Sequence, residues 1–153
     1  MKFIAHRANL NGSDSENENT PKQIEKCIDL GYDVEVDIWF DPELNSLWIG
    51  HDKPQYNISW EWIFKKSEYL WIHCKDILTM NQFCLNQNNF NFFWHQNDDY
   101  TLTSKKYIWT YPGKKYTSKC VIVMPELTIN LNDFSKPKSH NVYGICTDYV
   151  NLL

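Results

Sequence analysis

The chain has 153 residues and a net charge of −4, so it is long enough to bury the core of one domain, which we expect to span residues 1–153. The acidic balance argues against a nucleic-acid binder, because such domains usually carry a basic surplus. No apolar run reaches the roughly 18 residues of a membrane span, so we expect no stable membrane insertion. The polar N-terminus is unlike a signal peptide, which predicts a cytoplasmic location.

Five cysteines without a CxxC pair predict reduced, mostly buried thiols. Short apolar runs rich in β-branched and aromatic residues recur along the chain and predict seven core strands. These runs occupy residues 2–6, 32–40, 70–75, 91–96, 106–112, 120–126 and 142–148.

Helix signals separate the first runs. Residues 20–31 predict a helix, because Thr20 is a good N-cap and Gly31 a typical stop. Two further helices are expected to begin after Ser59 and Asp76. Strands that alternate with helices are typical of a parallel α/β sheet.

Two features modify this pattern. The segment "DPELNS" predicts a hairpin turn that extends the second strand beyond the sheet. Only about eight residues separate the fifth and sixth runs, fewer than the roughly dozen that a helical crossover takes. We therefore expect the helices to be reduced in the C-terminal half.

Polar residues sit in or beside the ends of the apolar runs, where an unpaired charge is costly. Glu35 and Asp37 lie two apart and project from one face of their strand. Carboxylates gathered there predict a divalent cation, and nearby histidines can accept and donate protons. The residues in this pattern are His6, Arg7, Glu35, Asp37, His51, Asp52, His73 and Lys75.

In order and spacing, "IAHR", "ENT" before a helix, "GYDVEVD" and "GHD" resemble the front half of the glycerophosphodiester phosphodiesterase family. The resemblance covers roughly residues 3–76, with weaker similarity in "YIWTYPG" and "GICTDYV". That family is built on a TIM barrel within the phospholipase C-like phosphodiesterases. The resemblance therefore implies an abbreviated TIM-like barrel of about seven mostly parallel strands, because a full barrel usually takes about 250 residues.

Carried over position by position, the resemblance implies a general acid–base pair, a divalent-metal site, phosphate contacts and acids behind them. His6 and His51 are the acid–base pair, Glu35 and Asp37 the metal ligands, and Arg7 and Lys75 the phosphate contacts. Glu18 is an acid behind these residues or an additional ligand, and Asp52 is a further acid behind them. His73 stands where the family has a further acidic ligand. A neutral imidazole there makes the site less selective for magnesium or calcium, shifts it toward manganese or zinc, or marks a site that has lost its metal.

Other aromatic and polar residues have less specific interpretations. Trp109, with Trp39 and Trp48, is a candidate platform for a substrate sugar or lipid headgroup, although most aromatic residues serve the core. His95 and Glu126 also lie at strand ends, without a further reason for a role. His140 lies in a Lys/Pro/Ser loop and is expected to be solvated.

Three functions follow as hypotheses. The first is metal-dependent hydrolysis of a small glycerophosphodiester-like substrate by two-histidine acid–base catalysis. The second is a catalytically inactive barrel that binds a phosphorylated headgroup or sugar, and the third is a lyase that forms a cyclic phosphate. An incomplete barrel wall would leave a sheet edge to cover, so a homodimer is also a possible assembly.

Overall fold

A computed structural model describes residues 1–86, 89–130 and 141–153, and His140 lies outside these residues. The structure is a mixed α/β fold with one ten-stranded sheet and three α-helices in the described part. Its strands are β1 (Lys2–Ala5), β2 (Asp33–Asp41), β3 (Ser46–Ile49), β4 (Tyr56–Ile58), β5 (Leu70–Cys74), β6 (Asn91–Phe93), β7 (Tyr100–Leu102), β8 (Ile108–Thr110), β9 (Cys120–Val123) and β10 (Gly144–Thr147).

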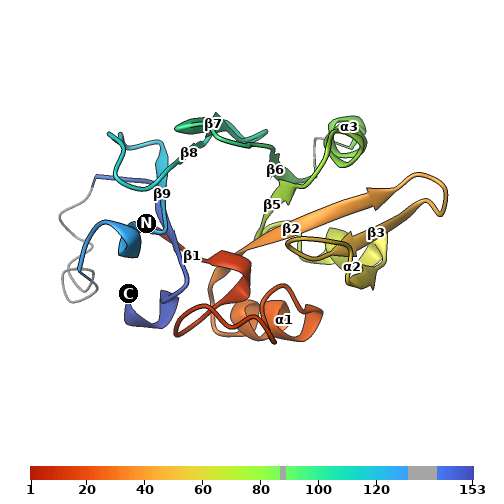
Figure 1. Cartoon of the computed structure of the whole chain (residues 1–153), viewed down its shortest axis with the longest axis horizontal. Coiled ribbons are helices and arrows are strands. Elements are labelled where there is room, and N and C mark those ends of the chain that lie inside the picture. Colours follow the sequence, from red (N-terminus) through yellow and green to blue (C-terminus); the bar gives the residue numbers. More distant parts are fainter. Residues whose placement is uncertain (87–88, 131–140) are drawn as a thin grey trace.

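The seven predicted strands are all present, and all run parallel. Their order is β6-β5-β2-β1-β10-β9-β8, with β1 between the second and the last strand of the chain. Figure 1 shows these strands curving around a common axis, with the α-helices outside. Parallel strands that curve together bring their carboxyl ends to one side of the fold, which is where the predicted site residues lie.

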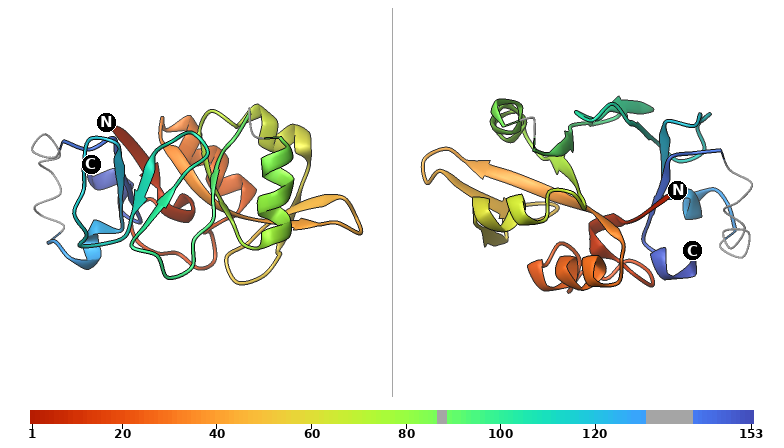
Figure 2. Two further views of the ribbon diagram at one scale, coloured as in Figure 1. Left: turned by 90° about the horizontal axis from the view of Figure 1, so that it is seen from above. Right: turned by 180° about the vertical axis from the view of Figure 1, so that it is seen from behind.

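The remaining strands are antiparallel. β3 pairs with β2 and β4, which confirms the hairpin predicted after the second strand. This hairpin projects away from the parallel strands, and Figure 2 shows both chain termini on the opposite side of the molecule. β7 pairs antiparallel with β8.

A closed TIM-like barrel is not formed by the described residues, so this part of the fold prediction needs correction. No ladder joins β6 to β7 or β8 in the described sheet. Instead, the backbone N–H of Ser104 donates to Phe92 O at 2.8 Å, and the Ser104 hydroxyl accepts from Phe92 N and donates to Phe90 O, each at 3.0 Å. The antiparallel arm that contains β7 takes the place of a helical crossover, and a serine bridges the resulting seam.

Helix formation follows the predicted signals. The Thr20 hydroxyl accepts from Gln23 N at the start of α1 (Pro21–Asp29), and Ser59 and Asp76 cap α2 (Trp60–Lys65) and α3 (Ile77–Leu85) in the same way. After Leu85 the only helical elements of the described residues are 3₁₀ turns, including η2 (Pro125–Leu127) and η4 (Val150–Leu152), which confirms the reduced helices of the C-terminal half.

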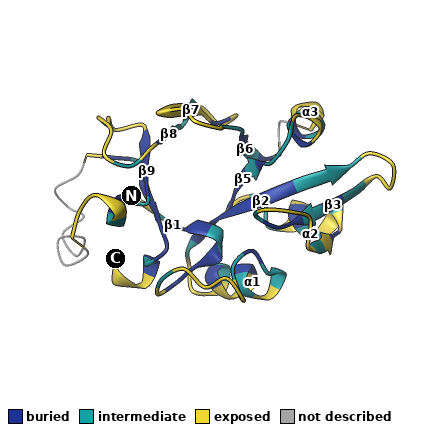
Figure 3. Ribbon diagram, in the orientation of Figure 1, coloured by how far each residue is buried: buried dark blue, intermediate teal, exposed yellow. Residues whose placement is uncertain are grey.

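The core lies between the parallel strands and the helices and inside the curved sheet. Figure 3 shows β1, β2, β5 and β9 largely buried, whereas the hairpin tip and outer helix faces are exposed. All five cysteines are free thiols and only Cys84 is exposed, as predicted. None of the described helices combines the length and apolarity needed to cross a membrane.

Candidate functional site

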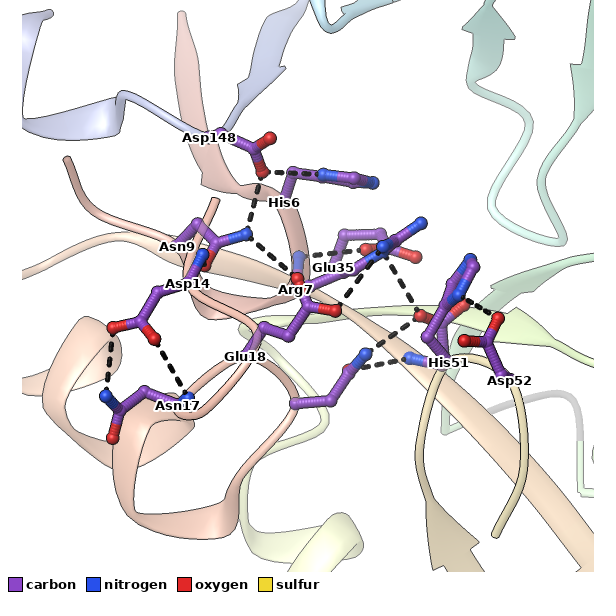
Figure 4. A network of polar contacts seen from close by, with 12 residues as sticks. His6, Arg7, Asn9, Asp14, Asn17, Glu18, Glu35, His51, Asp52 and Asp148 are labelled. Atoms are coloured by element: carbon purple, nitrogen blue, oxygen red, sulfur yellow. Dashed lines mark hydrogen bonds and ion pairs between the residues drawn. The ribbon is translucent and has the colours of Figure 1, made fainter. Parts of the chain in front are cut away.

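A cavity of about 230 Å³ lies at the carboxyl ends of the parallel strands. Four of the five histidines of the chain line it, together with Arg7 and the two acids predicted as metal ligands. These residues come from segments far apart in the sequence, and Figure 4 shows their polar side chains converging from several of them. The histidines that line the cavity are His6, His51, His73 and His95.

Asp37 is the most heavily contacted acid of the site. Its Oδ1 lies 2.9 Å from His73 Nδ1 and 3.2 Å from Lys75 Nζ, and its Oδ2 accepts from Asn19 Nδ2 at 2.9 Å and lies 3.6 Å from Arg7 Nε. Burial alone would raise the pKa of Asp37, but the hydrogen bond and charge of His73, then Lys75 and Arg7, hold it well below its usual range. Asp37 is therefore a carboxylate whose charge is balanced by the protein.

Glu35 projects from the same face of β2 and is equally buried. Its Oε2 accepts from the backbone N–H of Arg7 at 3.0 Å. Burial and the neighbouring charge of Asp37 raise the pKa of Glu35. Because a cation placed between the two acids would relieve both effects, Glu35 is the carboxylate that gains most from a bound positive charge.

His6 follows β1 in a short 3₁₀ turn, η1 (His6–Ala8), that departs from regular backbone geometry. Arg7 and Ala8 have φ values of 50° and 65°, in the left-handed region that residues with a Cβ rarely adopt. Two hydrogen bonds support this turn: Arg7 N to Glu35, and Asn19 N to Arg7 O at 2.8 Å. Local strain at a convergence of polar groups is typical of a functional site.

The turn directs the His6 ring into the cavity, and a carboxylate holds the Nδ1 atom of that ring. His6 Nδ1 lies 2.8 Å from Asp148 Oδ1, directly after β10, and Asn9 Nδ2 donates to the same oxygen. Burial disfavours the charged imidazole, but the hydrogen bond with Asp148 and the charges of Glu35 and Asp148 outweigh it and raise the pKa of His6. Only Nε2 of the ring is then free for chemistry.

His51 reaches the cavity from the loop after β3. Its Nδ1 lies 2.7 Å from Asp52 Oδ1, so this ring also has a carboxylate on one nitrogen. The loop folds back tightly after Gly50, where a Cβ would lie 2.1 Å from Lys53 O, so only glycine fits. Like His73 beside Asp37, two further histidines of the cavity thus have Nδ1 against an aspartate: His6 in a buried pair and His51 in a partly exposed one.

Glu35, Asp37 and His73 offer donor atoms that fit one metal ion. These atoms lie within 4.8 Å of one another, so small side-chain movements would bring all three within bonding distance of one ion, about 2.0–2.3 Å. His73 Nδ1 is 3.8 Å from Glu35 Oε1 as well as 2.9 Å from Asp37. Two carboxylates and one imidazole suit manganese, zinc or magnesium.

The remaining predicted residues surround this centre. Lys75 contacts Asp37 but is not among the residues that line the cavity. Glu18 lies behind Arg7, with its Oε1 3.5 Å from the guanidinium. Trp109 lines the cavity, whereas Trp39 and Trp48 line a separate groove beside it.

Several site residues were not predicted. Asn19 bonds both the carboxylate and the backbone of Asp37, and its place in "ENT" was the available signal. Asp148 ends the "GICTD" strand, so its position at a strand end could have identified it as the partner of His6. Glu126, which the sequence marked only by its place at a strand end, accepts from Asp148 N at 2.9 Å.

The structure places His95 in the cavity beside His73. Its ring stacks on that of His73 with centroids 4.6 Å apart and planes within 9°. Burial and the neighbouring His73 lower the pKa of His95 to about 4, so its ring is neutral near neutral pH. Parallel stacked rings cannot direct their nitrogens at one common ion, so His95 supports His73 by packing.

Comparison of the chain with protein-family models, curated proteins and solved structures finds no match.

Proposed function

We propose that this cavity cleaves a small phosphodiester, with His6 and His51 as the general acid–base pair. The observation that carries the proposal is that His6 and His51 line one cavity with the cationic Arg7. Each of the two rings has Nδ1 against an aspartate that is not a candidate metal ligand, Asp148 for His6 and Asp52 for His51. A carboxylate on one ring nitrogen fixes the tautomer and leaves the other nitrogen to transfer a proton. Two such rings can serve the attacking and the leaving oxygen of one phosphorus.

The chain's own groups divide the work around the phosphate. One histidine removes the proton of a water or alcohol as its oxygen attacks phosphorus, and the other protonates the departing alkoxide. The Arg7 guanidinium faces the phosphoryl oxygens, and Lys75 keeps Asp37 ionised from behind. The wall that includes Trp109 excludes water from one side, which strengthens each of these charge interactions.

A divalent ion held by Glu35, Asp37 and His73 would add positive charge at the phosphoryl oxygens. His73 Nδ1 already lies 2.9 Å from Asp37 Oδ1, so the imidazole and this carboxylate stand side by side where such an ion would bind.

The test is hydrolysis of bis(p-nitrophenyl) phosphate and glycerophosphocholine with magnesium, calcium, manganese or zinc. His51→Ala should lower turnover about 10²- to 10⁴-fold. Because His51 lies on a partly exposed loop, the free energy of unfolding of the His51→Ala protein should differ from that of wild type by less than about 0.5 kcal/mol. Gln55→Ala, an exposed change in the same loop, is the control and should keep full activity. Full activity of His51→Ala would refute the assignment.

One observation favours a second function, the recognition of a phosphorylated ligand without catalysis. Asp37 already has four donor groups around it, so the charge of this carboxylate is balanced without an ion. Folded protein that hydrolyses no diester with any of the four ions, yet binds inorganic phosphate, would support this function. Accumulation of a cyclic phosphate would instead identify a lyase.

A further inference from the structure

The groove beside the cavity is formed by the continuation of the same strand face. Successive residues of a strand alternate between faces, so Glu35, Asp37, Trp39 and Asp41 all project from one side of β2. The first two belong to the cavity, and the last two line a groove of about 420 Å³. Two residues advance a strand by about 7 Å, so Trp39 begins the groove about one such step beyond Asp37.

Two indoles form one wall of this groove. Trp48 of β3 pairs directly opposite Trp39 of β2 in the antiparallel ladder, so both rings lie on the same face of the hairpin. Both indole N–H groups are already used, that of Trp39 on Gly50 O at 2.6 Å and that of Trp48 on Ser46 Oγ at 2.9 Å. The rings therefore offer a ligand their faces and no hydrogen-bond donor.

Two carboxylates complete the groove, and each has one oxygen fixed and one free. Asp41 Oδ1 accepts from the backbone N–H groups of Glu43 and Leu44, and Asp76 Oδ1 accepts from Thr79 N at the start of α3. In the described part of the chain, neither Oδ2 has a hydrogen bond or ion pair. Both free oxygens are acceptors on side chains that local bonds already hold in place.

The groove thus combines ring faces that need a flat apolar partner with oriented acceptors that need hydroxyl donors. Among the described residues that line it, none is basic, so it does not suit a second phosphate. A sugar ring supplies both requirements, because its C–H face packs on aromatic rings and its hydroxyls donate strong hydrogen bonds to carboxylates.

We propose that the groove formed by Trp39, Trp48, Asp41 and Asp76 binds a sugar ring attached to the phosphodiester in the neighbouring cavity. The continuous face of β2 aligns the two subsites, so one ligand of glycosyl phosphodiester type occupies both. That the sugar is part of a substrate rests on the proposed function, whereas the binding of a sugar ring in the groove is independent of it.

The first experiment follows the indole N–H resonances of ¹⁵N-labelled protein during titration with methyl glycosides of glucose, galactose and N-acetylglucosamine. The Trp39 and Trp48 resonances should shift with at least one glycoside. Asp41→Asn and Asp76→Asn each retain the Oδ1 acceptor and replace the free oxygen by an amide donor. Each should weaken binding about tenfold to a hundredfold, the range of one hydrogen bond to a charged group. The control Glu43→Gln, an exposed acid in the same turn, should leave binding unchanged.

The second experiment separates this inference from the proposed function. A glycerol phosphodiester of the glycoside that binds and glycerophosphoethanolamine, which has no ring, are compared as substrates of the wild-type and Trp48→Ala proteins. Trp48→Ala should raise KM for the sugar diester about threefold to tenfold and leave glycerophosphoethanolamine hydrolysis unchanged.

The results of the two experiments test the sugar groove and the enzyme activity separately. Sugar binding without hydrolysis of any diester supports the groove and refutes the enzyme. Hydrolysis by a protein that shows no indole shifts with any glycoside refutes the groove alone. Shifts produced by choline and by no glycoside would also overturn the inference, because they would identify an organic cation as the ligand.

Discussion

Replacement of Asn19 by alanine should be among the most destabilising single changes near the site. The Asn19 side chain is buried, donates to Asp37 Oδ2 at 2.9 Å and accepts from Asp37 N at 3.2 Å. Loss of a hydrogen bond to a charged group costs about 1.5–3 kcal/mol, and a buried N–H without an acceptor costs about 1–3 kcal/mol. Asn19 also has a φ of 58°, a conformation that costs alanine about 1–2 kcal/mol.

These contributions overlap, so we expect Asn19→Ala to lower the free energy of unfolding by about 3–5 kcal/mol. Asn45 provides a matched control, because it has a φ of 47° in the exposed hairpin turn. Asn45→Ala should cost only about 1–2 kcal/mol, the conformational part alone.

Urea denaturation followed by far-UV circular dichroism measures both variants. With a slope of about 1–3 kcal/mol per molar, the Asn19→Ala midpoint should fall by at least about 1 M below that of wild type. Equal losses in Asn19→Ala and Asn45→Ala would show that the contacts with Asp37 add nothing, and would refute the account of how the acid is held.

Three further predictions concern other parts of the chain. The pKa of His6 is raised and the pKa of Asp148 is lowered, so their ion pair contributes its full stabilisation between about pH 4 and 6. This stabilisation is lost as the pH rises through the folded pKa of His6. The destabilisation caused by Asp148→Asn, measured by urea unfolding, should therefore shrink from pH 6 to pH 9. Burial raises the pKa of Cys27 to about 12, so mass spectrometry after iodoacetamide treatment of native protein at pH 8 should find Cys84 alkylated and Cys27 untouched. Ser104→Ala should cost about 1–3 kcal/mol and speed hydrogen exchange in β6, and unchanged exchange would show that the serine does not hold the seam.

The sequence was most informative where local signals and tertiary structure agree. Each of the seven parallel strands was visible as an apolar run, and the caps at Thr20, Ser59 and Asp76 formed as predicted. The hairpin after β2 followed from turn chemistry. These features depend on residues close together in the chain, so they can be read without knowledge of the fold.

The features that escaped prediction depend on contacts between distant segments. His6 and Asp148 are 142 residues apart, and Phe92 and Ser104 meet only because the antiparallel arm of β7 folds against β6. Apolar periodicity specifies that a strand is buried but not its direction or partner, so an incomplete barrel wall could be expected from the chain length but the position of the open seam could not. The grouping of the site residues was predictable because the carboxyl ends of parallel strands lie together, whatever the exact closure.

The absence of α-helices after Leu85 in the described residues does not disturb the candidate site, because helices and site residues lie on different faces of the sheet. Ile122, Val142 and Ile145 form a small outer cluster over β9 and β10, and Leu153 packs against it. This cluster buries outer apolar surface that a helix would otherwise cover. The site side chains project from the inner face and the strand ends, where their positions depend on strand pairing and on bonds such as Asp148 to His6. A thin outer layer in this half of the chain therefore leaves the positions of the acids, the histidines and the groove to the strands that carry them.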